Sequence, residues 1–266
     1  MIARAFVFGR DGWFRHNGCV GTVSKRGMKH LRGFGVLWCG VVLVLGVRSA
    51  VGQAGTFTVS QNGHAVGTAT FQVAAREGGF ESTSSVKVSM QGLEYSLSKT
   101  EEQDANHHLQ HVVLSGIVNG SVVNVIGKPD GANFLLNISA NGRGSTARLA
   151  GHAAAVFLPD FDAGALQTLL TVAVTQNGRD LWAVIPKQAG TVQAIQLATY
   201  ADEQGTLEGQ VIAVHHLAAT MAGEETDLFA GPDNELLQAE LPQPGFSLVR
   251  KGFVLTPPKR APAPER

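Results

Sequence analysis

Short segments in which apolar and polar residues alternate make up most of the chain after residue 55. In Thr56–Val73, which contains FTVSQNGHAVGTATFQV, the alternation runs up to the turn dipeptide Asn62-Gly63 and resumes after it, so a β-hairpin is predicted. Further alternating runs, separated by turn dipeptides at intervals of about 8–12 residues, predict more antiparallel strands. These strands are expected at residues 80–90, 93–102, 109–118, 122–126, 134–140, 181–186, 191–200, 206–217, 226–229, 235–241 and 246–255.

The stretch 162–176, DAGALQTLLTVAVTQ, departs from this alternation. Its apolar residues have the spacing of one helix face: Leu166, Leu169, Leu170, Ala173 and Val174. Either Asp160 or Asp162 can cap the N-terminus, and Asn177-Gly178 supplies a left-handed stop. The pattern predicts one amphipathic helix.

Many alternating strands and one helix indicate a mainly β fold class. An antiparallel sheet has to cover its apolar face, and a single helix cannot cover a sheet of this size alone. Three arrangements of the antiparallel meander therefore remain possible: a barrel, a half-barrel or a sandwich. Residues 55–255 are long enough for a single β-rich domain. The tail at 256–266, TPPKRAPAPER, is rich in Pro and charge and is expected to be disordered.

Residues 28–54 carry the pattern of a secretory signal peptide. A basic start at Lys29, His30 and Arg32 precedes an apolar stretch at 33–47, and small residues then lead to a cleavage site after Ala54. The apolar stretch is shorter than the roughly 20 residues of a membrane-spanning helix. We therefore expect cleavage, with a retained N-terminal anchor as the alternative. Residues 1–27 are interpreted as an over-extended gene start.

Removal of this leader changes the charge and the cysteine content. The chain has 21 basic and 21 acidic side chains, of which eight basic and one acidic lie in residues 1–54. Residues 55–266 therefore carry 13 basic and 20 acidic side chains, and this acidic balance excludes nucleic acid as a partner. Cys19 and Cys39 leave with the leader, so the mature chain is expected to have no disulfide. The expected location is the periplasm or the extracellular space, including the periphery of the outer membrane.

A glycine-rich stretch offers the first candidate chemistry. Gly142–Ala147 reads G-R-G-S-T-A and matches the dinucleotide-binding pattern G-x-G-x-x-A. That chemistry needs a helix to begin after the turn inside a βαβ unit, which the sequence does not predict here. We interpret the stretch as a glycine-rich β-turn.

Histidines and paired carboxylates are the next candidates. His215 and His216 are adjacent in a strand and point to opposite faces, whereas His107 and His111 supply two ligands where zinc needs three or four. The carboxylate pairs at 101–102 and 224–225 are interpreted as solvated turn residues. None of these groups predicts a metal site.

Two enzyme alternatives stay open. Ser145 is a candidate nucleophile, although the chain lacks the G-x-S-x-G pattern of the nucleophile elbow. His152, Asp160 and Asp162 form the one set that could converge on a metal or a substrate. Neither is strong enough for an assignment, so no catalytic, cofactor-binding or metal-binding residue is predicted and no cofactor is expected.

Two hairpin sequences carry a family resemblance. The segment FTVSQNGHAVGTATFQV resembles the first hairpin of bacterial periplasmic domains of unknown function, and TDLFAGPDNELLQAEL at 226–241 is similar to a late strand pair of such domains. Those domains resemble the half-barrels of outer-membrane lipoprotein carriers, in which a curved antiparallel sheet wraps a helix and holds acyl chains. The resemblance implies an envelope β-protein with an apolar ligand.

The sequence thus favours an exported envelope protein without catalytic activity. It is expected to bind an apolar small molecule or a lipid, or to scaffold a protein partner in the envelope. A secreted hydrolase or metal-dependent enzyme is the alternative. No transmembrane span is expected in the mature form.

Overall fold

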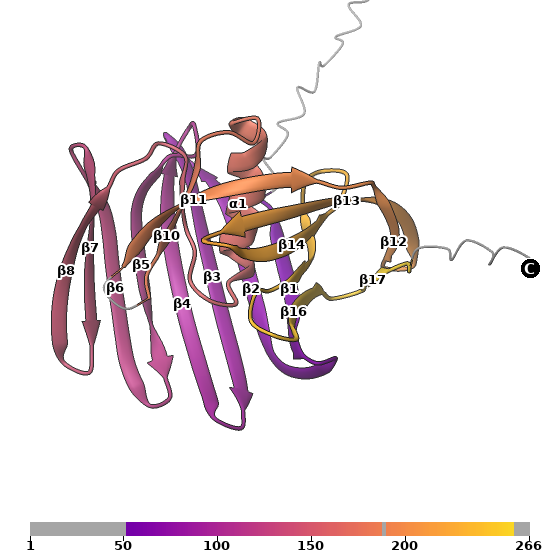
Figure 1. Ribbon diagram of the computed structural model, residues 1–266, viewed down its shortest axis with the longest axis horizontal. Helices are drawn as coiled ribbons and strands as arrows, with labels where there is room; N and C mark the ends of the chain where they lie inside the picture. Colours follow the sequence, from indigo (N-terminus) through magenta and orange to yellow (C-terminus); the bar gives the residue numbers. More distant parts are fainter. Residues whose placement is uncertain (1–51, 188–189, 258–266) are drawn as a thin grey trace, which may run out of the picture. The chain divides into compact units, whose positions relative to one another are not determined.

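The first half of the fold is a continuous antiparallel meander. The computed structural model describes residues 52–187 and 190–257. Each strand of the meander pairs with the next one in sequence, and Figure 1 shows them as one curved sheet. Their bounds are β1 Ala54–Gln61, β2 His64–Arg76, β3 Gly79–Met90, β4 Leu93–Asp104, β5 Leu109–Val118, β6 Ser121–Asp130, β7 Asn133–Ala140 and β8 Arg143–Ala150. The mainly antiparallel β fold class is confirmed.

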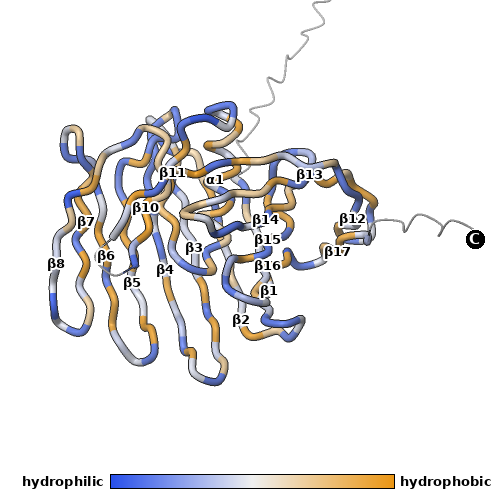
Figure 2. The backbone as a smooth tube through the Cα atoms, in the orientation of Figure 1, coloured by the Kyte–Doolittle hydropathy of each residue, from blue (hydrophilic) through white to orange (hydrophobic). Residues whose placement is uncertain are grey.

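Asn-Gly turns set the register of this meander. The pairs at 62–63, 119–120 and 141–142 have positive φ at both residues, the conformation of the two-residue hairpin turns that match the twist of paired strands. Buried and exposed residues alternate most regularly along β3 and β4. Figure 2 shows the hydropathy changing repeatedly along the strands of the meander. One face of the meander is therefore apolar and has to be covered.

A parallel βαβ unit follows the meander. Strand β9, Ala155–Phe157, pairs in parallel with β10, Leu181–Ile185, and helix α1, Ala163–Thr175, connects them. The prediction of one helix with a cap and a left-handed stop is confirmed, because Asp162 caps the N-terminus and residues 177–178 have positive φ. The alternation missed β9, whose three residues are all buried and therefore show no period of two.

Helix α1 is buried on most of its circumference rather than on one face. Ten of its 13 residues are buried, including Gln167 and Thr168. The predicted apolar face is correct for Leu169 and Leu170 but wrong for Val174, which is 57% exposed near the C-terminus. The helix contacts β2, β3, β9 and β15, so it fills the interior that the sheet surrounds.

The C-terminal strands extend the sheet from its other edge. They are β11 Thr191–Thr199, β12 Glu203–Leu207, β13 Gln210–Met221, β14 Glu224–Ala230, β15 Leu236–Glu240, β16 Phe246–Arg250 and β17 Phe253–Leu255. Two predicted strands are wrong, because 206–217 and 246–255 each contain a turn. Glu208-Gly209 and Lys251-Gly252 form these turns, and positive φ at Glu208 is the less expected feature.

Pairing between β1 and β16 joins the two groups of strands into one sheet. The sheet curls around α1 until β9 lies against β5 and β11 lies near β8. It is not closed into a barrel, so the half-barrel is the predicted arrangement that fits. Side chains fill its interior, with Phe57, Phe157, Leu136 and Leu169 almost completely buried.

The predicted leader and tail lie largely outside the described residues. Strand β1 begins at Ala54, the residue predicted to end the leader, and residues 256–257 are the described part of the predicted tail. The described residues contain no cysteine and hence no disulfide. Among them, no helix combines the length and the apolar character needed to cross a bilayer.

Candidate functional site

A short loop between β9 and α1, Leu158–Asp162, has an unusual backbone at its centre. Phe161 has a φ of 58°, which is rare for a bulky side chain. This backbone conformation is unfavourable by itself, so contacts with surrounding residues have to stabilise it. Its buried ring packs edge-on against Tyr95, with centroids 5.4 Å apart, and against Phe246 at 5.0 Å. The loop is therefore held in a strained conformation by aromatic packing.

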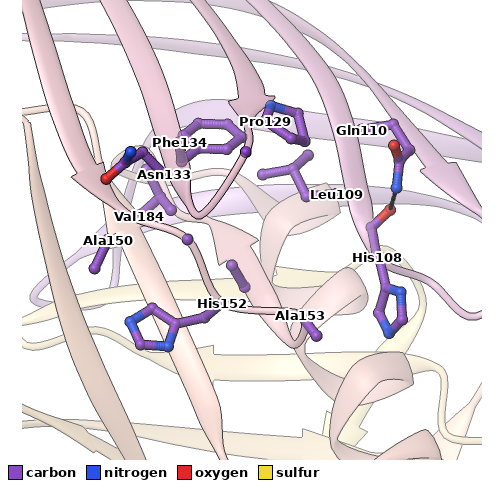
Figure 3. A pocket seen from close by; sticks show the side chains of 13 residues that line it. His108, Leu109, Gln110, Pro129, Asn133, Phe134, Ala150, His152, Ala153 and Val184 are labelled. Atoms are coloured by element: carbon purple, nitrogen blue, oxygen red, sulfur yellow. Dashed lines mark hydrogen bonds between the residues drawn. The ribbon is translucent and has the colours of Figure 1, made fainter.

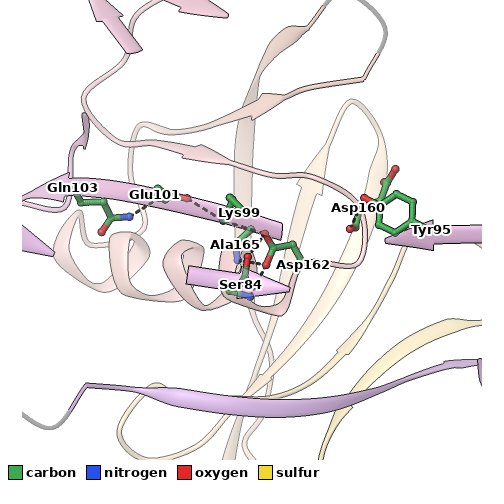
Figure 4. Close-up of polar contacts among 9 residues, drawn as sticks. Ser84, Tyr95, Lys99, Glu101, Gln103, Asp160, Asp162 and Ala165 are labelled. Atoms are coloured by element: carbon green, nitrogen blue, oxygen red, sulfur yellow. Dashed lines mark hydrogen bonds and ion pairs between the residues drawn. The ribbon is translucent and has the colours of Figure 1, made fainter. Parts of the chain in front are cut away.

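Side chains from β3 and β4 hold this loop in place through hydrogen bonds and an ion pair (Figure 4). The Tyr95 hydroxyl donates to the Asp160 carbonyl at 3.0 Å, and Ser84 donates to the Asp162 carboxylate at 2.9 Å. Lys99 Nζ lies 3.1 Å from the same carboxylate oxygen. The other oxygen of Asp162 accepts from the amides of Gly164 and Ala165 at the start of α1. One carboxylate thus ties the loop to the sheet and the helix.

The contacts continue along β4 as a row of buried polar side chains. Lys99 Nζ lies 3.0 Å from Glu101 Oε2, and Gln103 donates to Glu101 Oε1 at 2.7 Å. The side chains of Lys99, Glu101 and Asp162 are 1%, 0% and 2% exposed. Burial alone would lower the pKa of Lys99, but Asp162 and Glu101 outweigh it and raise that pKa above its ordinary value. Lys99 therefore stays charged.

Tyr95 also stays protonated. Burial, together with the charges of Asp160 and Asp162, raises the pKa of its hydroxyl far above the ordinary value. Its hydroxyl is consequently a permanent donor to the loop.

The loop forms one wall of a cleft of about 410 Å³, which we call the loop cleft. Its walls come from the loop, the first turns of α1, the end of β10, the β13–β14 turn and residues 241–243. The apolar lining includes Leu158, Phe161, Leu166, Ile185, Met221 and Leu241. The volume lies toward the lower end of the range for ligand pockets, about 300–1,000 Å³.

Polar groups gather at one end of the loop cleft. Asp160 Oδ1 accepts from Lys187 Nζ at 2.8 Å and from Gln243 Nε2 at 3.1 Å. The Oε1 atom of Gln243 is buried and has no hydrogen-bond partner among the described residues. A buried acceptor without a donor is unfavourable. The partly exposed Asp160 carboxylate is the acceptor that a ligand in the cleft can reach.

The predicted set His152, Asp160 and Asp162 is split between two sites. His152 stacks on Trp182, with ring centroids 3.6 Å apart, and lines a separate pocket of about 260 Å³ with His108 and Phe134 (Figure 3). Both aspartates line the loop cleft. Within residues 52–187 and 190–257, no three His, Cys, Asp or Glu side chains are arranged to hold a metal ion.

Ser145 lies on a strand rather than on the expected glycine-rich turn. The turn is limited to Asn141-Gly142, and Ser145 is an exposed residue of β8, which also contains Gly144. No helix begins after it, so the dinucleotide pattern lacks its structural context, in agreement with the sequence argument.

The other histidines lie apart from one another. His215 contacts Asp202 at 2.9 Å, while His216 lies between Glu203 at 3.2 Å and Asp227 at 2.9 Å. His107 occupies the turn before β5 and stacks on Phe80, whereas His111 is on β5.

The pocket in Figure 3 contains an oriented histidine that the sequence did not reveal. Asp104 accepts from the amides of Asn106 and His108 and lies 3.1 Å from His108 Nδ1. Burial would raise the pKa of Asp104, but the two amide hydrogen bonds together with His108 lower it below its ordinary value. These contacts form a local turn, and no nucleophile lines the described part of the pocket.

His107 gives a testable pH dependence. Burial lowers its pKa below 6.5, with Asp104 opposing and His108 assisting that effect. The unfolded chain then binds a proton before the folded one does, so stability is complete above about pH 6.5 and falls as the pH drops below it. We expect His107→Asn, which tolerates the positive φ, to flatten the decline in free energy of unfolding between about pH 7.5 and 5.5.

Urea unfolding at several pH values measures this effect, with His64→Asn as a control at the exposed first residue of β2. Equal slopes for the wild type and His107→Asn would contradict the expectation.

No protein-family model and no curated protein matches this chain. Among solved structures, it is similar to the crystal structure of a DUF1089 family protein from Pseudomonas aeruginosa, with 13% identity and a TM-score of 0.38. The match covers 66% of this chain and 89% of that one. A likeness of this strength carries no argument about fold or function, and the resemblance to lipoprotein carriers finds no support in it.

The residues that form the loop cleft were largely missed by the sequence analysis. Asp160 and Asp162 were considered as metal ligands or helix caps, but Lys187, Met221 and Gln243 were not considered. Lys99 and Glu101 carried one usable signal. They follow Tyr95 and Leu97 at a spacing of two, which places them on the buried face of β4.

Proposed function

We propose that this protein is a non-catalytic binding protein of the cell envelope and that its loop cleft takes a small molecule with an apolar body. The observation that carries this proposal is the strained loop. Phe161 is held at positive φ by Tyr95 and Phe246, and the same loop forms a wall of the loop cleft, which has an apolar part. Strain of this kind is concentrated at ligand-binding sites.

The filled interior limits the size of the ligand. A carrier of long acyl chains needs a cavity inside the sheet, whereas here α1 and large side chains such as Phe157 and Leu136 occupy that space. The cleft opens at the surface and has the volume of a small ligand site. We therefore narrow the apolar ligand expected from the sequence to a small molecule.

Neither other function has a specific observation in its favour. The described residues bring no nucleophile, base and acid together around Ser145, and the set His152, Asp160 and Asp162 is divided between two pockets. A scaffold for an envelope partner would need a defined contact surface, which the described residues do not single out.

Saturable binding of the neutral apolar fluorophore N-phenyl-1-naphthylamine tests the proposal. We expect binding at one site per chain and a loss of affinity of about tenfold or more in Met221→Glu, because a charge then enters the apolar wall. Val211→Glu is the matched control, since Val211 is on the same strand but outside the cleft and 73% exposed. Absence of saturable binding, or equal losses in both variants, would overturn the proposal.

Export is tested separately. N-terminal sequencing of the protein recovered from the envelope fraction should begin near Gly55. A start at Met1 would remove the basis for placing the protein in the envelope.

A further inference from the structure

The polar end of the loop cleft contains the ion pair between Asp160 and Lys187, whose two side chains differ in how firmly they are held. Asp160 is fixed by its backbone, because its carbonyl accepts from Tyr95 and its neighbour Asp162 is tied to Ser84 and Lys99. Lys187 reaches Asp160 from the end of β10, and its side chain is 56% exposed against 26% for Asp160. An exposed lysine pair of this type contributes little to stability, so the carboxylate is fixed and its cation is replaceable.

The charges around the cleft favour a positively charged ligand. Asp160, Asp162 and Glu224 line it together with a single cation, Lys187. Asp162 is already neutralised by Lys99, so one carboxylate remains in excess when Lys187 pairs with Asp160. A ligand cation that displaced Lys187 would leave the lysine free to return to solvent.

Gln243 helps to orient the Asp160 carboxylate, because its Nε2 donates to Asp160 Oδ1. An ammonium group offers three donors and no acceptor, which matches a carboxylate. A ligand carboxylate would instead place its acceptor oxygens against those of Asp160.

We propose that the ligand of the loop cleft is a primary alkylamine whose ammonium replaces Lys187 on Asp160 while its apolar body lies against Phe161, Leu166 and Met221. This inference rests on the proposed binding function and adds the chemistry of the polar end. The ammonium donates to Asp160, and the alkyl chain lies against the apolar wall.

Displacement of N-phenyl-1-naphthylamine by octylamine, octanol and octanoate tests the inference at a constant chain length. Octylamine is expected to bind about tenfold more tightly than octanol, since hydrogen bonds to a charged group are stronger than neutral ones. Octanoate is expected to be the weakest of the three. If octylamine binds no more tightly than octanol while the fluorophore still binds, the inference of an amine ligand is overturned but the proposed function stands.

Two variants are expected to change the affinity for octylamine in opposite directions. Lys187→Met removes the competing cation and should tighten octylamine binding by about threefold or more without changing octanol binding. Asp160→Asn should weaken octylamine binding by about tenfold and octanol binding much less. If Lys187→Met instead weakens octanoate and leaves octylamine unchanged, the ligand is an anion and the inference is overturned. Failure of the fluorophore and all three ligands to bind overturns the proposed function itself.

Discussion

Replacing Lys99 with Met is expected to lower the free energy of unfolding by about 3–5 kcal/mol. Lys99 Nζ lies within 3.1 Å of both the Glu101 and the Asp162 carboxylates, and all three side chains are almost completely buried. Methionine has a similar length but no charge, so two buried carboxylates would lose their common cation. The cost arises from these unpaired charges rather than from lost packing.

Urea unfolding of the wild type and Lys99→Met measures this loss, and Lys87→Met is the matched control. Lys87 is exposed on β3, the strand next to β4, so its replacement should change stability by no more than about 0.5 kcal/mol. Adding Glu101→Gln to Lys99→Met should recover part of the loss, because a neutral amide is less costly to bury than a carboxylate. A loss below about 1 kcal/mol for Lys99→Met would show that this pair of contacts is not formed in solution.

The same residues show what the sequence can and cannot predict. Alternation and Asn-Gly turns are local signals, and they located β1 to β7 within a few residues, whereas β8 was interpreted as a glycine-rich turn. Glu101 was interpreted as a solvated turn residue, yet its side chain is completely buried. Glu101 lies at a spacing of two from Tyr95 and Leu97, on the buried face of β4. Its charge argued for the surface, and the partners that make its burial possible come from β4 itself and from the distant Asp162.

Non-local contacts account for the remaining differences. The pairing of β1 with β16, the parallel contact of β9 with β10 and the curl of the sheet around α1 join segments far apart in sequence. The loop cleft depends on all three, because its walls come from the loop before α1, the end of β10 and two C-terminal turns. Residues such as Met221 and Gln243 carry no local pattern that would have brought them to one site.

Replacing Leu169 with Ala is expected to lower the free energy of unfolding by about 3–5 kcal/mol. Leu169 is completely buried at the centre of α1, where the helix fills the interior of the curled sheet. Truncation leaves a cavity that the surrounding strands can collapse onto only in part. Urea or thermal unfolding measures the loss.

Val174 is the matched control on the same helix. It distinguishes the burial seen in the structure from the burial that the helical periodicity predicts. Both residues belong to the face predicted from spacing, but Val174 is 57% exposed. Val174→Ala should therefore change stability by no more than about 0.5 kcal/mol, with a small gain in helix propensity offsetting the lost methyl groups. Comparable losses in the two variants would mean that the C-terminal turn of α1 packs against the sheet, and the helix would then be amphipathic as its spacing indicates. A large loss confined to Leu169 shows instead that the position of the helix inside the sheet, rather than its periodicity, decides which side chains stabilise the fold.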